Sequence, residues 1–207
     1  SSATGYQVVR VNNQGWEESK INYSNKPPIS TVIGSSGNFT SGSWTSVDVT
    51  SFVTGNGVYG MALTTTSSTI MNFSSRDAAS NKPQLVIETS AGSVPPTPTH
   101  TPTPTVTAGS GNVLTFTAAA DARVVQASPT ANYGTATTLL ADGDSGAAVT
   151  SFIRFTASGI SGPVQSVKLR VYCTTNGTNN GPAAYLANSS WTESGTGGIN
   201  WNNQPAL

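Results

Sequence analysis

The chain has 207 residues and no net charge, and only 9% of its residues are Asp, Glu, Lys or Arg, where about 25% is usual. It has no basic stripe that could neutralise nucleic-acid phosphates or be drawn to an anionic membrane surface. The sequence also has no apolar run of about 18 residues, which excludes a membrane-spanning helix.

Ser, Thr, Asn and Gly take the places that charged residues usually hold, and good helix formers are scarce. Residues that suit strands are well represented. Up to residue 90 they form short runs: "YQVVRV" from Tyr6, "WTSVDVTSFV" from Trp44, "VYGMALTT" from Val58 and "PQLVIETS" from Pro83. Val47 and Val49 alternate with polar residues, which predicts a strand with one face in the core.

Residues 91–110 are predicted to be a linker, because "VPPTPTHTPTPTVT" is too rich in proline for a sheet ladder. A polyproline II helix is favoured, and its central part could span on the order of 40 Å. Thr/Pro tracts of this kind are typical O-glycosylation substrates, although a bare spacer has the same composition. The candidate sites are Thr97, Thr99, Thr101, Thr103, Thr105 and Thr107.

After the linker, six further runs predict strands: "NVLTFTA", "ARVVQA", "ATTLLADG", "TSFIRFTA", "SVKLRVYC" and "PAAYLANSSW". In "SVKLRVYC" the alternation places Lys168, Arg170 and Tyr172 on an outer face and Cys173 on the core face. Cys173 is the only cysteine, so no intramolecular disulfide framework exists. Short strands separated by turn residues predict an all-β protein, a sandwich or a barrel.

One pattern occurs twice: "WEESKINYSNKPP" begins at Trp16, and "WTESGTGGINWNNQP" begins at Trp191. The first copy stands near the start of a strand-rich portion, and the second stands at the end of another. This predicts that residues 1–90 are the C-terminal portion of one β-sandwich repeat and residues 111–207 the N-terminal portion of the next. Without the linker the repeat has about 158 residues, the size of a jelly-roll sandwich.

The two portions could instead close on each other as a circular permutant. Residues 1–29 repeat what residues 174–207 already supply, so two copies would compete for one place. The simpler interpretation is a window cut from a longer tandem array. The expected partners are then neighbouring copies of the same repeat, in tandem or head to tail.

Several segments resemble the DNRLRE-domain family. After the linker they include "ADARVVQASPTANYGTATTLLADG" and "SFIRFTASGISGPVQSVKLRVYC". Before the linker, "WTSVDVTSFVTG" and "NFSSRDAASNKPQLVIET" follow the order of that family's C-terminal part. The hexapeptide of the family's name is absent. The resemblance implies antiparallel jelly-roll β-sandwiches in secreted, multidomain surface proteins, some of which bind polysaccharides, alginate among them.

No grouping of residues predicts catalysis. The only histidine, His100, lies in the linker, which excludes Ser-His-Asp triads and Cys/His zinc sites within the domains. The chain is therefore expected to be no enzyme and to need no cofactor. A weaker hypothesis is structural calcium held by Asp142 and Asp144 in "LADGDSG", with Asp121 from another strand. Asp-Gly-Asp is also an ordinary turn sequence.

Aromatic side chains are the candidates for sugar binding: Tyr23, Trp44, Tyr133 and Trp201. The alternative is that they fill the core or cap its end, which is what we expect of Trp16 and Trp191. Five Asn-x-Ser/Thr sequons are N-glycosylation candidates: Asn22, Asn38, Asn72, Asn176 and Asn188.

Two functions fit these observations. The first is a structural β-sandwich repeat of an extracellular fibre, stalk or surface layer, glycosylated on its linker and loops. The tandem motif, the Thr/Pro linker and the scarcity of charge favour it. The second is a carbohydrate-binding module carried by a secreted polysaccharide-acting enzyme. Either function places the chain outside the cell or at its surface.

Overall fold

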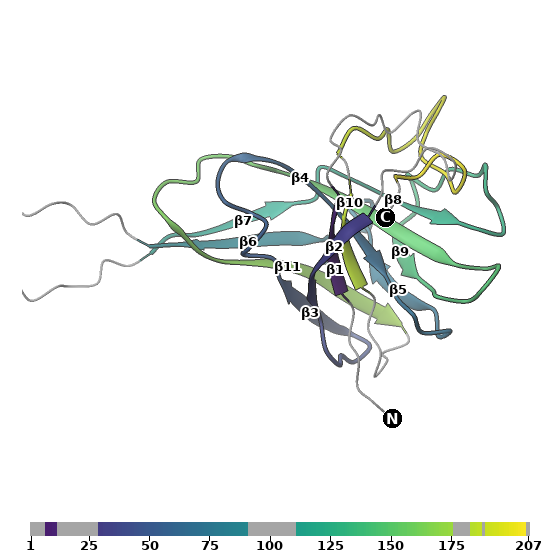
Figure 1. Ribbon diagram of the computed structural model, residues 1–207, viewed down its shortest axis with the longest axis horizontal. Helices are drawn as coiled ribbons and strands as arrows, with labels where there is room; N and C mark the ends of the chain where they lie inside the picture. Colours follow the sequence, from purple (N-terminus) through teal and green to yellow (C-terminus); the bar gives the residue numbers. More distant parts are fainter. Residues whose placement is uncertain (1–6, 12–28, 91–110, 176–182, 188, 206–207) are drawn as a thin grey trace, which may run out of the picture.

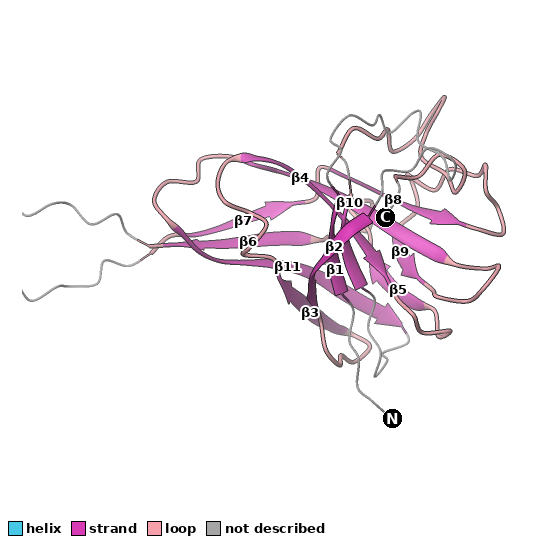
Figure 2. Ribbon diagram, in the orientation of Figure 1, coloured by secondary structure: helices cyan, strands magenta, loops and turns pink. Residues whose placement is uncertain are grey.

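The computed structural model describes residues 7–11, 29–90, 111–175, 183–187 and 189–205. Within these ranges the fold consists of strands, loops and turns, and no segment is helical (Figure 1 and Figure 2). No helix there is long and apolar enough to cross a membrane. The strands pair antiparallel in two sheets, which confirms the predicted all-β sandwich.

The first sheet has six strands in the order β1-β2-β12-β4-β10-β8. Their bounds are β1 Gln7–Val11, β2 Ile29–Ser35, β12 Ala183–Leu186, β4 Gly57–Thr64, β10 Val149–Ala157 and β8 Ala120–Val125. The second sheet runs β7-β6-β11-β5-β9, and β3 also pairs with β11. Their bounds are β7 Val113–Thr117, β6 Gln84–Thr89, β11 Val164–Thr175, β5 Met71–Ser74, β9 Thr138–Ala141 and β3 Ser43–Asp48.

Both sheets contain strands from before and after the linker, and these strands are interleaved. β4 lies between β12 and β10, and β6 lies between β7 and β11. The described strands from before and after the linker thus close on each other into one sandwich, although the duplicated motif argued against this closure. The interpretation of the portions as parts of consecutive repeats stays a prediction.

The main core lies between the two sheets and draws on both portions. Alternate residues of the strands point into it, as a sandwich requires. Val47 and Val49 are buried there, and so is Cys173, which confirms the alternation predicted for their strands. The largest buried side chains of this core include Met61, Leu63, Met71, Phe73, Leu85, Ile87, Leu139 and Phe155.

A second apolar cluster covers the opposite face of the first sheet. Ala62 of β4, Phe152 of β10 and the alanines of β8 contact Trp191, Ile199 and Trp201 of the C-terminal segment. Trp191 is 1% exposed. The guanidinium of Arg154 lies 5.3 Å from its ring centre and donates a hydrogen bond to its carbonyl oxygen. Trp191 therefore anchors the C-terminal segment, as the sequence predicts.

Candidate functional site

The outer face of β3, β11 and β6 displays a regular set of polar and aromatic side chains. Trp44 of β3 stands opposite Tyr172 of β11, and Ser46 stands opposite Arg170. Arg170 is in turn opposite Gln84 of β6. Strand register thus brings residues that are more than 120 positions apart in the sequence into one surface. We call Trp44, Ser46, Gln84, Arg170 and Tyr172 the Trp44 face.

Trp44 is held in place by its neighbours on this face. Its ring meets that of Tyr172 edge to face, with centres 5.6 Å apart and planes at 75°. The Arg170 guanidinium carbon lies 4.7 Å from the Trp44 ring centre, within cation–π range. The indole is only half-buried, so a fixed aromatic surface remains open to solvent.

Both partners of Trp44 are themselves positioned by hydrogen bonds. Arg170 Nη1 donates to Gln84 Oε1 at 3.3 Å, and the Tyr172 hydroxyl donates to the Gly42 carbonyl at 2.9 Å. Such support fixes the rotamers of a binding surface before a ligand arrives.

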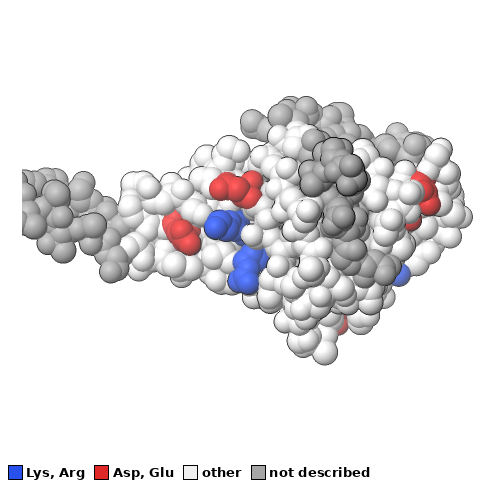
Figure 3. All heavy atoms as spheres, turned by 90° about the horizontal axis from the view of Figure 1, so that it is seen from below, with Lys and Arg blue, Asp and Glu red and all other residues white. Residues whose placement is uncertain are grey.

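Charges of both signs continue the same face. Lys168 stands opposite Asp48 across the β11–β3 pair, and both are exposed. Figure 3 shows basic side chains gathered beside acidic ones on one face of the molecule, surrounded by uncharged residues. The surface offers hydrogen-bond donors and acceptors within a short distance of the indole.

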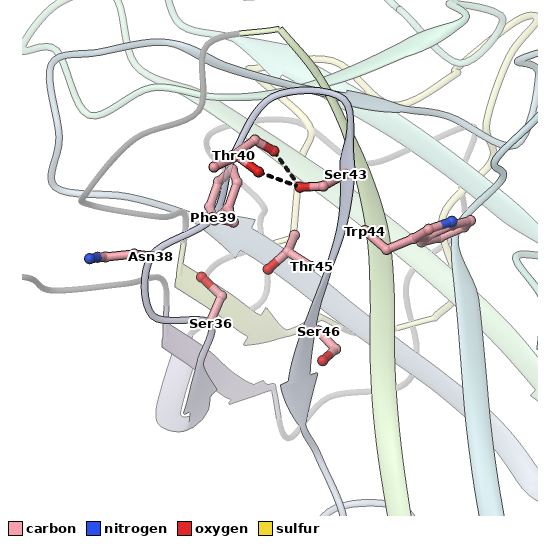
Figure 4. A pocket seen from close by; sticks show the side chains of 8 residues that line it. All are labelled: Ser36, Asn38, Phe39, Thr40, Ser43, Trp44, Thr45 and Ser46. Atoms are coloured by element: carbon pink, nitrogen blue, oxygen red, sulfur yellow. Dashed lines mark hydrogen bonds between the residues drawn. The ribbon is translucent and has the colours of Figure 1, made fainter.

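A shallow groove of about 410 Å³ borders β3. Hydroxyl and amide groups line most of it, from Ser36, Asn38, Thr40, Ser43, Thr45 and Ser46. Figure 4 shows that the Trp44 indole points away from Ser36 and Asn38, across the neighbouring strand. The Ser43 hydroxyl donates to the Thr40 carbonyl at 2.5 Å and so ties the loop to β3. The groove adjoins the Trp44 face, because Trp44 and Ser46 also line it.

A second group of functional side chains lies within the fold, where Asp77, Asp121 and Glu193 bring carboxylate oxygens within 4.8 Å of one another. Arg76 binds Glu193 through two nitrogens, with Nε 2.5 Å from Oε1 and Nη2 on Oε2. The Arg76 backbone N–H also donates to Asp121 at 2.6 Å. These contacts pair Glu193 with an arginine side chain and Asp121 with a backbone amide.

The main chain of Glu193 is fixed by close packing against residues 132–134. Asn132 Nδ2 donates to the Glu193 carbonyl at 2.6 Å. A Cβ at Gly134 would come within 1.6 Å of that same oxygen, so the position requires glycine. The loop that begins at Trp191 thereby positions the Glu193 side chain beside Arg76.

Burial changes the acidity of this group. Desolvation raises the pKa of Asp121 from 3.8 to about 8, against the hydrogen bond from the Arg76 backbone. Desolvation also raises the pKa of Glu193, against its hydrogen bond with Arg76. The hydrogen bond to Glu193 raises the pKa of Arg76. Asp121 therefore retains its proton near neutral pH while Arg76 and Glu193 form the ion pair.

The acidic residues proposed for calcium lie in different surroundings. Asp121 is in the Arg76 group, which includes neither Asp142 nor Asp144. Asp142 follows β9, and its Oδ1 accepts the backbone N–H of Asp144 at 3.1 Å, the arrangement of an ordinary Asx turn. A calcium site at these aspartates stays a prediction.

The aromatic candidates also separate. Trp201 is 6% exposed within the second apolar cluster, which agrees with the alternative that this side chain fills the core. Tyr133 is half-buried and lies 5.0 Å from the Arg123 guanidinium. Tyr23 is outside the described residues. Trp44 remains the candidate that has a supported, partly exposed ring.

Of the glycosylation candidates, two lie in described parts of the chain. Asn38 is exposed in the loop between β2 and β3, whereas Asn72 is within β5. Asn22, Asn176, Asn188 and the linker threonines Thr97, Thr99, Thr101, Thr103, Thr105 and Thr107 are outside the described residues.

Sequence reasoning placed Lys168, Arg170 and Tyr172 on an outer face, which the structure confirms. It did not single out Gln84 or Ser46, nor Arg76 as the partner of Glu193. The alternation of "WTSVDV" could have indicated that Ser46 shares a face with Trp44. No local pattern predicts a contact between Arg76 and Glu193, which are 117 positions apart.

The model of carbohydrate-binding module family 96 matches residues 1–89 and 112–207, on both sides of the linker. No curated protein and no solved structure matches the chain. The matching family is not the DNRLRE-domain family, so the resemblance to that family is not confirmed. The resemblance implied carbohydrate binding for some members, and carbohydrate binding is the property after which the matching family is named. With nearly all of the sequence outside the linker covered by that match, the chain belongs to carbohydrate-binding module family 96.

Proposed function

We propose that this chain binds a polysaccharide through the Trp44 face and has no catalytic role of its own. Family membership supports the class of ligand. The observation that carries the choice of surface is the half-buried Trp44 ring, held between Tyr172 and Arg170 beside a groove lined by hydroxyls.

The chemistry of the face suits a sugar chain. The apolar side of a pyranose ring packs on an aromatic surface, and its hydroxyls need donors and acceptors around that contact. Arg170 and Gln84 supply both kinds of group, and Ser46 supplies a hydroxyl. Because their positions are fixed by sheet register, little conformational entropy is lost when a ligand binds.

Trp44→Ala is expected to weaken polysaccharide binding about tenfold or more, since rigid aromatic side chains dominate binding energies. Affinity electrophoresis in gels that contain single polysaccharides would identify a ligand, and isothermal titration with an oligosaccharide of that polymer would measure the change. Tyr172→Phe keeps the ring and removes the hydroxyl, so it should weaken binding less than Trp44→Ala.

The control for that experiment is Tyr133→Ala, which removes another half-buried aromatic ring on a different part of the fold. It should leave the affinity within about twofold of the parent chain, and both variants should keep the far-ultraviolet dichroism of a β-sandwich. Equal losses in Trp44→Ala and Tyr133→Ala, or no loss in Trp44→Ala, would contradict the proposed surface.

The family match favours carbohydrate binding over a purely structural repeat in a fibre or stalk. A module that binds polysaccharide meets its ligand outside the cell, so we place the chain there, in a secreted or surface protein. Attachment to a polysaccharide-acting enzyme and glycosylation of the linker threonines and the sequons belong to the same proposal.

A further inference from the structure

Most strand pairs of the sandwich join one portion of the chain to the other. Among the described residues, ten pairs of strands are hydrogen-bonded, and only β1–β2 and β8–β10 join strands of the same portion. The other eight link a strand before the linker to one after it: β4–β10, β3–β11, β5–β11, β6–β11, β2–β12, β4–β12, β5–β9 and β6–β7.

The strands β3, β5 and β6 show the consequence most clearly. None of them pairs with another described strand from before the linker. On their own they would present unpaired backbone edges and the apolar side chains Phe73, Leu85 and Ile87 to water. Residues 29–90 therefore form a set of strands that a partner must complete.

Side-chain contacts cross the same boundary. Phe73 and Leu85 of the first portion share a core with Phe155 and Leu169 of the second. The ion pair of Arg76 with Glu193 also joins the two. Shared apolar surface and a bidentate charge pair are what a specific interface needs.

The covalent tie between the portions restricts their pairing very little. Twenty residues separate residue 90 from residue 111, and the two ends of this segment meet where the Thr89 backbone N–H donates to the Asn112 carbonyl at 2.9 Å. Since that meeting point is the open end of the β6–β7 pair, β6 of one chain could lie beside β7 of another with every contact of the sandwich retained.

We propose that residues 29–90 are a strand-donor segment that docks onto residues 111–205 of a second copy of this chain, so that two chains exchange portions. Both sandwiches of the exchanged pair then have the contacts of the closed chain. A covalent tie of twenty residues gives an effective concentration of about the millimolar range, so exchange becomes extensive when chains fold together at about that concentration. The Trp44 face is rebuilt as well, because Trp44 and Tyr172 then come from different chains.

Two core variants with full-length chains test the exchange. Leu63→Asp places a charge in β4, and Phe155→Asp places one in β10, and both positions are fully buried. Each variant alone has one damaged portion in every sandwich that it can form. The two variants are unfolded together and refolded at about 1 mM chain. They can then build one undamaged sandwich, from the portion before the linker of the Phe155→Asp chain and the portion after the linker of the Leu63→Asp chain.

We expect a dimer peak in size-exclusion chromatography from the mixture, about tenfold larger than from either variant alone, with a cooperative melting transition. A mixture that equals the sum of the separate samples would overturn the exchange. Native mass spectrometry with one variant labelled with ¹⁵N identifies the mixed dimer directly.

A cut in the linker provides a second test that does not depend on damaged variants. A recognition sequence for a specific protease, inserted after His100, allows the folded parent chain to be cleaved. The two fragments should elute together and, after joint unfolding and refolding with ¹⁵N-labelled fragments, should form mixed pairs. Fragments that separate on cleavage, or that fail to mix, would contradict the proposal, and neither result depends on whether the chain binds a sugar.

Discussion

Replacing Arg76 with methionine is expected to lower the free energy of unfolding by roughly 3 kcal/mol, near the lower end for loss of one partner of a buried pair. Glu193 has a side chain that is only 6% exposed, whereas that of Arg76 is 35% exposed, so the carboxylate is the group that would lose its compensation. Methionine keeps much of the aliphatic stem, which limits the loss of packing. Urea denaturation followed by circular dichroism would measure the change.

Two further variants separate the ion pair from other effects of this substitution. Arg170→Met removes a guanidinium from the surface, where a charge contributes at most about 1 kcal/mol. Arg76→Met combined with Glu193→Gln removes both charges, so it should be more stable than Arg76→Met alone. A loss of less than about 1 kcal/mol in Arg76→Met, or a double variant that is less stable than the single one, would contradict the structural role of the pair.

Sequence patterns predicted the strands well because sandwich strands have one buried and one open face. "SVKLRVYC" alternates over residues 166–173 of β11, and burial follows it residue by residue up to Cys173. The pattern of "WTSVDV" does the same in β3. Where a strand is covered on one side only, the period of two in the sequence carries the orientation of each side chain.

The same reasoning gave a different result for the strands that are covered on both sides. β4 and β10 have consecutive buried residues, Met61 to Leu63 in the first and Ser151 to Ile153 in the second. One face packs on the second sheet and the other lies under Trp191 and Trp201. An apolar run shows that both faces are buried but not what covers them, so the sequence left open whether Trp201 is packed or exposed.

The closure of the two portions had no local signal either. Each β-strand pattern is compatible with any partner strand, and pairing is decided by the complete set of edges and apolar faces. The duplicated motif indicated that residues before Trp16 correspond to residues before Trp191, and both segments form strands, β1 and β12, that pair with β2. The sequence thus contained the duplication, while the choice of neighbours required the three-dimensional arrangement.

The candidate site, too, could be predicted from the sequence only in part. The residues of β11 on the Trp44 face follow from alternation, but the contact of Arg170 with Trp44 depends on the register of β3 against β11. Arg76 and Glu193 are 117 positions apart, and they meet because the Trp191 loop is pinned against residues 132–134. Contacts of this kind between distant loops are set by packing and have no periodicity that a sequence could display.

The stability of the fold is expected to decrease as pH rises from about 4 to about 8, and Asp121 is the reason. Its folded pKa is about 8, whereas its ordinary value is 3.8. Between these values the folded chain holds a proton that the unfolded chain releases. The unfolded state is therefore stabilised relative to the folded state as pH increases. This loss of stability is absent below pH 4 and complete above pH 8. Glu193, whose pKa is also raised, adds a change of the same sign.

Asp121→Asn isolates this effect, because asparagine keeps an acceptor for the Arg76 backbone N–H and cannot ionise. Between pH 5 and pH 8 the parent chain should lose on the order of 3 kcal/mol of unfolding free energy, at about 1.4 kcal/mol per pH unit of full titration. The Asn variant should lose much less and be the more stable of the two at pH 8.

Urea denaturation at four pH values would measure both curves, and taking their difference isolates the contribution of Asp121. Parallel curves for the parent and the Asn variant would show that Asp121 does not hold a proton in the fold. The same measurement on Asp77→Asn, which removes the exposed carboxylate of the group, should still show the decrease in stability with pH, because that variant keeps the buried carboxyl group of Asp121.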